Sequence, residues 1–518
     1  MSEKEYIVTL HRNVDYQTFD AEMVANTGAG AIPNRSAPIA NPRPGSKRNT
    51  HYMLTEQEAE MLRNDPRVFG VEIPPEKRED LELGLRATQT GNFTKTSDNI
   101  GDFINWGLRR CNESTNPYTE NSVEGGYDYT LDGTGVDIVV HDTGIQADHP
   151  EWEDANGTSR LQEIDWYTAS GLPGTLPDGF YTDYHGHGTH VGSTIAGKTY
   201  GWAKNAKIYA LKVDGLEGPT DPNGGIPISD CFDVVKEWHN NKPIDPVTGV
   251  KRPTIVNMSW GYSSFWTSLS AIQYRGTTYT GTDIDEISEL TSKGLIPVFD
   301  GSRYKTNVRI ASVDADVQEM IDAGIHVVIA AGNNYHKIDI EGGEDYDNNL
   351  TGTYIIFPTN VYYNRGSSPY DEEAHNVGNI DSAVHAGGLE QKAESSETGP
   401  GVNVFAPGTN IMAAASNVNV FNGDGEYPPN TDFKISNISG TSMAAPQVAG
   451  VLALYAQVNP GATPAQGLAF INDNASSDKL FSTGLDNDYD NYRSLAGGNN
   501  RFLFNKFNSG IQLSIGNS

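Results

Sequence analysis

The sequence predicts an α/β fold in which a mostly parallel sheet follows a small α+β unit. Apolar runs that suit buried strands alternate with helical segments from about residue 105 onward, a pattern typical of parallel sheets. Residues 136–140 and 325–330 are apolar at nearly every position, as expected for strands covered on both faces. The chain has 518 residues, more than one hydrophobic core usually serves, so two or more units are expected.

The first 80 residues carry the pattern of the small unit. Thr55 and Glu58 have the spacing of a capping box at the start of a short helix. The expected strands of this unit are 6–10 and 65–72, and its expected helix is 55–62. Residues 81–104 are polar, charged and poorly periodic, which predicts a linker to the second unit.

Residues 105–510 are expected to form the main domain. Its expected strands are 136–140, 206–213, 254–259 and 325–330, and its expected helices are 189–196, 229–239, 317–323 and 442–457. Two stretches, near 262–312 and 335–375, break the alternation and are rich in Gly, Tyr, Asn and Asp. Segments of this kind usually run over the surface, so two surface insertions are expected.

The composition narrows the possible partners and locations. The chain has 36 Lys and Arg against 67 Asp and Glu, a formal net charge of −31, whereas nucleic-acid binding usually requires a basic patch. The sequence contains no run of about 18 apolar residues, so no membrane span is expected. The N-terminus lacks the apolar segment of a signal peptide, which makes the cytoplasm the default location and leaves release or particle association open. Two cysteines, Cys111 and Cys231, build no disulfide scaffold, and their pairing is left open.

Three short motifs carry groups for nucleophilic catalysis. Asp142-Thr-Gly follows a buried strand, His187-Gly-Thr-His starts a helix, and Gly-Thr-Ser442-Met-Ala-Ala-Pro starts another. A serine hydroxyl needs a base, an imidazole can take and return its proton, and a buried carboxylate fixes the tautomer of the imidazole. Each motif supplies one of these groups, and the helix N-terminus adds oriented N–H groups beside Ser442.

In this order the motifs resemble the signatures of the subtilisin-like serine proteases, over about residues 106–507. The resemblance implies a three-layer subtilisin-like fold, with Asp142 as orienting acid, His187 as general base and Ser442 as nucleophile. Val-Val-Ile-Ala-Ala-Gly-Asn333 resembles the family segment whose asparagine side chain donates to the oxyanion. The implied reaction is hydrolysis of peptide bonds in polypeptides through an acyl-enzyme, with no cofactor required for the chemistry.

The segment that begins at Asn257 resembles the family strand that pairs with substrate beside the specificity pocket, and a glycine pair resembles part of the opposing strand. The residues implied to bind substrate are Ser259, Trp260, Gly261, Gly224 and Gly225. Trp260 departs from the smaller aliphatic residue common at its position, which puts the size of the pocket in doubt. Asp183, just before the histidine motif, is expected from its charge to favour basic substrate side chains.

Metal sites stay open from the sequence. The segment 198–204 resembles the proteinase K branch of the family, in which Asp381 would correspond to a ligand of structural calcium. A solvated loop aspartate is the alternative at that position. Glu151 is interpreted as a surface carboxylate, with a calcium ligand as the alternative. His185 and His190 crowd the catalytic histidine, but no second group of ligands completes a zinc site.

The N-terminal unit resembles the inhibitory propeptide of the same family. This implies a self-processing zymogen whose propeptide binds the mature enzyme and is cut off between about residues 80 and 98. A monomer is expected. Two alternatives stay open: a structural or particle-associated protein that keeps its N-terminal unit, and an acyl transferase or ligase that uses the same triad.

Overall fold

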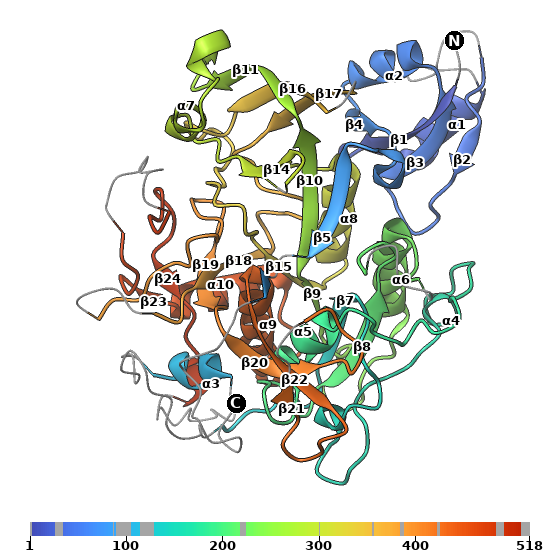
Figure 1. Cartoon of the computed structure of the whole chain (residues 1–518). Coiled ribbons are helices and arrows are strands. Elements are labelled where there is room, and N and C mark those ends of the chain that lie inside the picture. The colour runs from blue at the N-terminus through green and yellow to red at the C-terminus, as the bar shows by residue number, and fades with distance from the viewer. Residues whose placement is uncertain are drawn as a thin grey trace.

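The computed structural model describes residues 3–25, 35–85, 88–89, 105–113, 129–217, 224–299, 301–354, 357–383, 388–421, 425–482 and 492–508. The chain forms an N-terminal unit, a main domain around an eight-stranded sheet, and an inserted lobe built from residues 262–312 and 335–375 (Figure 1).

The N-terminal unit packs two helices against an antiparallel sheet of order β2-β3-β1-β4. Its elements are β1 (Lys4–Leu10), α1 (Tyr16–Ala25), β2 (Ile39–Asn41), β3 (Asn49–Leu54), α2 (Glu56–Arg63) and β4 (Val68–Glu72). Tyr6, Phe19 and Tyr52 are buried in a core that belongs to this unit alone. The capping box of α2 is confirmed, because Thr55 and Glu58 exchange their hydrogen bonds.

The main sheet has the order β23-β24-β19-β18-β15-β9-β7-β8 and is parallel except at the edge pair β23–β24. Its strands are β7 (Asp137–Asp142), β8 (Lys207–Lys212), β9 (Thr254–Met258), β15 (His326–Ala330), β18 (His375–Ile380), β19 (Val404–Pro407), β23 (Ser476–Ser477) and β24 (Arg501–Phe502). The major helices are α5 (His187–Ala196), α6 (Ile228–Asn241), α8 (Ala311–Asp322) and α9 (Thr441–Val458). The predicted α/β fold is therefore confirmed.

Alternation along the strands gives the sheet a core on each face. In β7, Ile138 and Val140 join the hydrophobic cluster that contains α5 and α9. Val139, between them, joins the cluster that contains α6 and α8. Helices thus cover both faces, and the domain has three layers. Shorter helices complete it: α3 (Trp106–Arg110), α4 (Trp166–Ser170) and α10 (Pro464–Asn474).

The linker expected at 81–104 is wrong where the structure describes it. Leu81–Leu85 form β5, which pairs antiparallel with β10 (Trp260–Trp266) and leads from the N-terminal unit into the main domain (Figure 1). Thr88–Gln89 form β6, which pairs with β22 (Lys434–Ser439). An edge strand keeps one side toward solvent, so its polar residues resemble those of a linker. The rest of the range lies outside the described residues.

The two expected insertions are not separate surface loops. β11 (Ser268–Tyr274) in the first pairs with β16 (Asn349–Tyr354) in the second, within a sheet of order β12-β11-β16-β17. Ile272 and Leu350 are fully buried in the cluster that also contains α6 and α8. The remaining elements of the inserted lobe are β12 (Thr277–Tyr279), α7 (Ile287–Ser292), β13 (Val298–Phe299), β14 (Tyr304–Asn307) and β17 (Phe357–Tyr362).

The inserted lobe also extends the substrate-side sheet. β14 pairs with β10, so that β13, β14, β10 and β5 form one antiparallel sheet. A further small sheet joins β6 and β22 to β20 (Ile411–Ala415) and β21 (Gly425–Glu426). Cys111 and Cys231 are free thiols buried in different clusters. Within the described ranges, no helix has the length and apolar composition that a membrane span needs.

Candidate active site

The carboxyl ends of three neighbouring parallel strands bring the motif residues together. Asp142 is the last residue of β7, Ser259 follows β9, and Asn333 lies just beyond β15. His187 is the first residue of α5, and a hydrogen bond of 2.7 Å joins its Nδ1 to Asp142 Oδ1. Ser442 lies in the first turn of α9. This is the edge at which open α/β sheets usually carry their sites.

The catalytic hydroxyl is held away from its base. Ser442 Oγ donates to the main-chain carbonyl of Ser259 at 2.8 Å, and Ser259 Oγ donates back to the Ser442 carbonyl at 3.1 Å. The Nε2 atom of His187 is buried and has no hydrogen-bond partner among the described residues. Ser442 Oγ must therefore turn toward His187 before the imidazole can take its proton.

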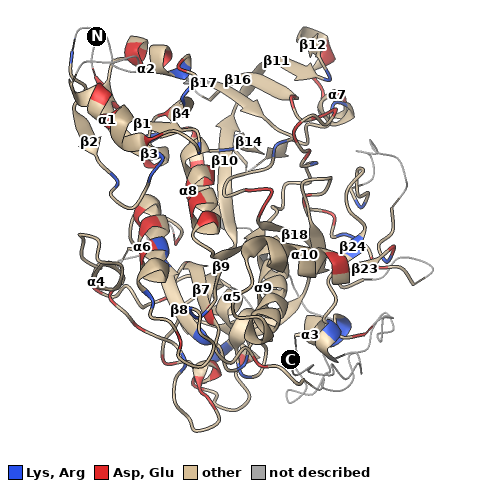
Figure 2. Ribbon diagram, turned by 180° about the vertical axis from the view of Figure 1, so that it is seen from behind, with Lys and Arg blue, Asp and Glu red and all other residues tan. Residues whose placement is uncertain are grey.

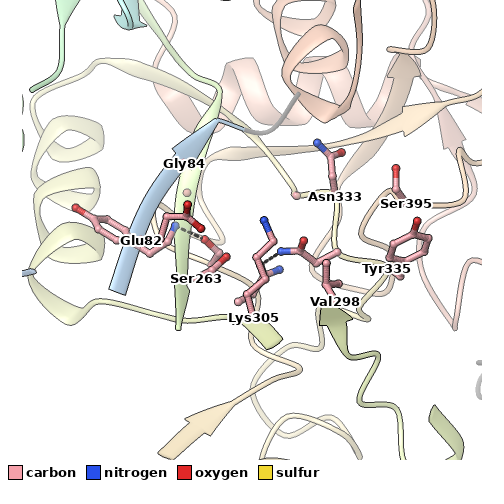
Figure 3. A pocket seen from close by; sticks show the side chains of 14 residues that line it. Glu82, Gly84, Ser263, Val298, Lys305, Asn333, Tyr335 and Ser395 are labelled. Carbon is pink, nitrogen blue, oxygen red and sulfur yellow. Dashed lines mark hydrogen bonds between the residues drawn. The ribbon is translucent and has the colours of Figure 1, made fainter. Parts of the chain in front are cut away.

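Asn333, the predicted oxyanion donor, is oriented by Thr441, the residue before Ser442. Asn333 Oδ1 accepts from the N–H of Thr441 at 3.0 Å and from its hydroxyl at 3.1 Å. Thr441 Oγ1 in turn accepts from the N–H of Gly332 at 3.1 Å. Because the amide oxygen is fixed on this side, the amide nitrogen faces the cleft beside the N-terminus of α9 (Figure 3).

Asp183 supports the triad and does not reach substrate. It is 1% exposed, and Oδ1 accepts from the Thr143 hydroxyl at 3.0 Å and the Gly186 N–H at 2.8 Å. Oδ2 accepts from the N–H of Thr189 at 2.9 Å. Burial, with a smaller contribution from the nearby Asp142 charge, raises the pKa of Asp183. The expectation that it selects basic substrates was wrong, because charge alone does not reveal that a carboxylate caps a buried loop.

The neighbouring histidines are structural. His190 Nε2 donates to the carbonyl of Ile411 at 3.0 Å, and burial lowers the pKa of His190 to about 3. Burial likewise lowers the pKa of His185 to about 4, and its ring makes an edge contact with His187. In the part of the chain that the structure describes, no group of three or more His, Cys, Asp or Glu is placed to hold a metal ion.

Trp260 lies in the core and is not among the residues that line the pocket beside Asn333. Its indole is fully buried, donates to the carbonyl of His141 at 3.0 Å and makes edge contacts with Phe232 and Tyr262. The main chain of the same segment pairs with β5, where Trp260 stands opposite Leu85. The predicted substrate segment is thus a strand that already carries a partner.

Gly224 and Gly225 lie beside the end of β8. Ile226, the next residue, pairs in parallel with Val213. Its N–H donates to the carbonyl of Lys212, and its carbonyl accepts from the N–H of Asp214. A Cβ at Gly225 would lie 2.3 Å from the carbonyl oxygen of Lys212, so only glycine fits there. Substrate binding by the glycine pair stays a prediction.

The residues at the expected calcium position do not fit a divalent cation. Asp381 Oδ2 accepts from Arg493 at 2.8 Å, so a guanidinium already neutralises the carboxylate. Glu151 is not a surface residue: it is fully buried and accepts from the N–H of Thr199 at 3.1 Å and the hydroxyl of Tyr427 at 3.0 Å. The sequence did not predict the burial of Glu151, because several residues around it are polar or charged. Structural calcium elsewhere stays a prediction.

Comparison with known proteins agrees with this geometry. The family model described as "Subtilase family" matches residues 133–491. The chain is 27% identical over 416 residues to the extracellular serine proteinase of a Thermus species, an alignment that covers 80% of this chain and 67% of that protein. It is 26% identical to alkaline serine exoprotease A of Vibrio alginolyticus over 83% of this chain, but spans only 55% of that protein.

A solved structure shows the same fold. The keratinolytic enzyme fervidolysin from Fervidobacterium pennivorans, described as related to subtilisin, aligns over 99% of this chain and 62% of its own, with a TM-score of 0.52 and 18% identity. At that identity the likeness concerns the fold alone. The family model, however, covers more than half of the chain around all three catalytic motifs, and the chain therefore belongs to the subtilase family as a subtilisin-like serine endopeptidase.

Proposed function

We propose that this chain is made as a self-processing zymogen that hydrolyses peptide bonds through an acyl-enzyme on Ser442. The observation that carries the proposal is the position of β5. β5 pairs antiparallel with β10, the strand that resembles the substrate-binding segment of the family, with Gly84 opposite Gly261 and Leu85 opposite Trp260. An extended peptide added to a sheet edge is how such a cleft takes substrate. The N-terminal unit thus supplies the first occupant of its own active site.

β5 and β6 pair with segments on either side of the nucleophile. Leu85 lies opposite Trp260, next to the Ser259 carbonyl that holds the catalytic hydroxyl. Thr88 lies opposite Ser439, three residues before Ser442. The peptide bonds between Leu85 and Thr88 are therefore the ones proposed for self-cleavage. Asp142, His187 and Ser442 are all 0% exposed in the intact chain, which fits an inhibited precursor.

Mutation of the nucleophile tests the proposal. Purified wild-type chain should lose its N-terminal unit from the main domain, whereas Ser442→Ala should stay full length. N-terminal sequencing of the shortened product should begin at Arg86, Ala87 or Thr88. Equal masses for the two chains would refute self-processing, and a cut that persists in Ser442→Ala would assign it to another protease.

Labelling separates the triad from processing. A fluorophosphonate probe should modify Ser442 in the processed chain and leave His187→Ala unmodified, because only a serine beside its base is nucleophilic. Processed chain that takes no label would refute the proposed mechanism. Product analysis should give mainly free acids even with an added amine, which distinguishes a hydrolase from a transferase.

A further inference from the structure

A pocket beside the substrate strand contains a cation that the triad does not use. We propose that Lys305 selects acidic side chains in the substrate, at the strand positions that β5 fills with Glu82 and Gly84. This selectivity rests on the proposed function, because β5 is taken as the stand-in for a substrate. Lys305 comes from β14, so the inserted lobe would set the specificity of this protease.

The register of three strands, β5, β10 and β14, places the cation on the substrate face. Glu82 stands opposite Ser263, and Ser263 stands opposite Asn307, so these three side chains share one face of the sheet. Lys305 lies two residues from Asn307 on the same strand and therefore points to that face as well. All four, together with Gly84, line one pocket of about 370 Å³ (Figure 3).

The opposite wall of the pocket is polar. It is formed by Asn333, Asn334 and Tyr335 after β15, and by Ser395. The pocket thus extends from the oxyanion asparagine to Lys305, and groups that can donate hydrogen bonds line it at both ends (Figure 3). Such a lining suits a carboxylate, which accepts several hydrogen bonds when it is ionised.

The ammonium group of Lys305 lacks a counter-ion among the described residues, although the chain has a net charge of −31. Glu82 is exposed on the same face and likewise makes no ion pair within the described ranges. The buried Glu397 does not line the pocket: its Oε1 atom accepts from Asn307 at 2.7 Å and from the N–H of Asn334 at 3.1 Å. The positive charge of Lys305 is therefore available to a substrate.

β5 also shows what each face of a bound substrate strand would contact. Leu81 and Leu83 pack against the hydrophobic cluster of α6 and α8, whereas Glu82 and Gly84 face the pocket. Gly84 has no side chain, so its place leaves the room that a substrate side chain would fill. The preferred substrate strand alternates apolar residues with acidic ones, in the register of 81 to 84.

The test compares peptides that differ at one position. Processed enzyme is assayed with peptides that carry Leu in the place of Leu83 and Glu, Gln or Lys in the place of Gly84. At low ionic strength, kcat/KM should be about tenfold higher for Glu than for Lys, the factor expected when a charged pair replaces a repulsive one. Lys305→Met should remove this preference, Lys305→Glu should invert it, and added salt should weaken it.

A matched control uses a lysine at the amino ends of the main-sheet strands, away from the predicted active site. Lys207 starts β8 and is exposed, far from the carboxyl ends that carry the triad, so Lys207→Glu should leave the preference unchanged. Every Lys305 variant should still take one equivalent of fluorophosphonate on Ser442. An enzyme that labels and cleaves, but shows equal rates for Glu and Lys or the same ratio in Lys305→Glu, would overturn the selectivity and leave the protease intact. A wild type that neither labels nor cleaves would overturn both proposals.

Discussion

Ser442 and Asn333, the predicted nucleophile and oxyanion donor, are positioned by main-chain groups and by one threonine. Ser442 rests on the carbonyl of Ser259, while Thr441 holds the oxygen of the Asn333 amide. The asparagine is thereby fixed before any substrate arrives, and such fixed donors stabilise charge that develops only in the transition state. Rotation of one hydroxyl is then the smallest movement needed to bring the triad together.

Removal of the oxyanion donor should slow chemistry more than it weakens binding. Asn333→Ala is expected to lower kcat of the processed enzyme about 10²- to 10³-fold with little change in KM, because the lost hydrogen bond forms mainly in the transition state. Steady-state kinetics on a neutral peptide would check this. A variant that lost affinity and kept its kcat would show that Asn333 binds ground-state substrate instead.

The site residues were predictable to different degrees. Asp142, His187 and Ser442 stand in short local motifs, and the structure joins Asp142 to His187 as predicted. The direction of a side chain is set by its surroundings, so neither the burial of Trp260 nor the capping role of Asp183 could be predicted from charge or size. A polar residue beside a catalytic motif is often a support that makes no contact with substrate.

The N-terminal unit contacts α6 and α8, two helices of the main domain that carry several acidic residues (Figure 2). Arg43 is 2% exposed and donates to Asp233 on α6 at 3.0 Å and to Asp316 on α8 at 2.9 Å. Glu72 accepts from the N–H of Ser312 at 2.8 Å, in the first turn of α8. A carboxylate at a helix N-terminus satisfies free N–H groups and favours the dipole. These contacts fasten the N-terminal unit to α6 and α8.

Loss of the buried arginine should loosen the N-terminal unit. In a Ser442→Ala background, Arg43→Met removes the cation that joins the two carboxylates and leaves Asp233 with Lys236 at 3.8 Å. Loss of one partner of a buried pair costs about 3–5 kcal/mol. Hydrogen exchange across β1 and β3 should then become faster. Arg12 also reaches α8, where it pairs with Asp322, but its side chain is 53% exposed, so Arg12→Ala should have an effect below about 1 kcal/mol. Equal protection in both variants would show that packing alone holds the interface.

The elements of the main sheet could be predicted because each is a local pattern. Asp137–Asp142 and His326–Ala330 are buried on both faces and contain long apolar runs. The pairing of β11 with β16 joins segments far apart in the chain, and no local periodicity encodes it. β5 was missed for a different reason, since Glu82 and the residues around it have a composition that also suits a linker.

Several histidines of the described residues are buried and have a lowered pKa. Burial is the largest cause that lowers the pKa in each case. The histidines whose pKa is lowered are His51, His141, His149, His185, His190, His239, His326, His336 and His375. His51 lies in the N-terminal unit and the other eight lie in the main domain, so the main domain should be the more sensitive of the two to acid.

Stability should therefore fall in mild acid. A histidine whose folded pKa is depressed contributes stability above its unfolded pKa of about 6.5, and this stability is lost as the pH falls below that value. The unfolding midpoint of Ser442→Ala should drop steeply from about pH 7 to pH 5, with an uptake of several protons on unfolding.

A pair of variants resolves the contribution of one site. Burial lowers the pKa of His375 to about 3, so His375→Gln should reduce the proton uptake by about one. His11 is exposed, and His11→Gln should leave the slope unchanged. A midpoint that stays constant across this range would mean that the imidazoles become charged without unfolding the chain.

The order of the strands along the chain has a consequence for biogenesis. Translation proceeds from the N-terminus, and domains generally fold in that order. β5 therefore leaves the ribosome before β10, and β14 follows after it. When β10 emerges, β5 has already been synthesised and can pair with one of its two edges. The cleft is thus built around β5, and under the proposed self-processing the removal of this strand would be the last step in the maturation of the enzyme.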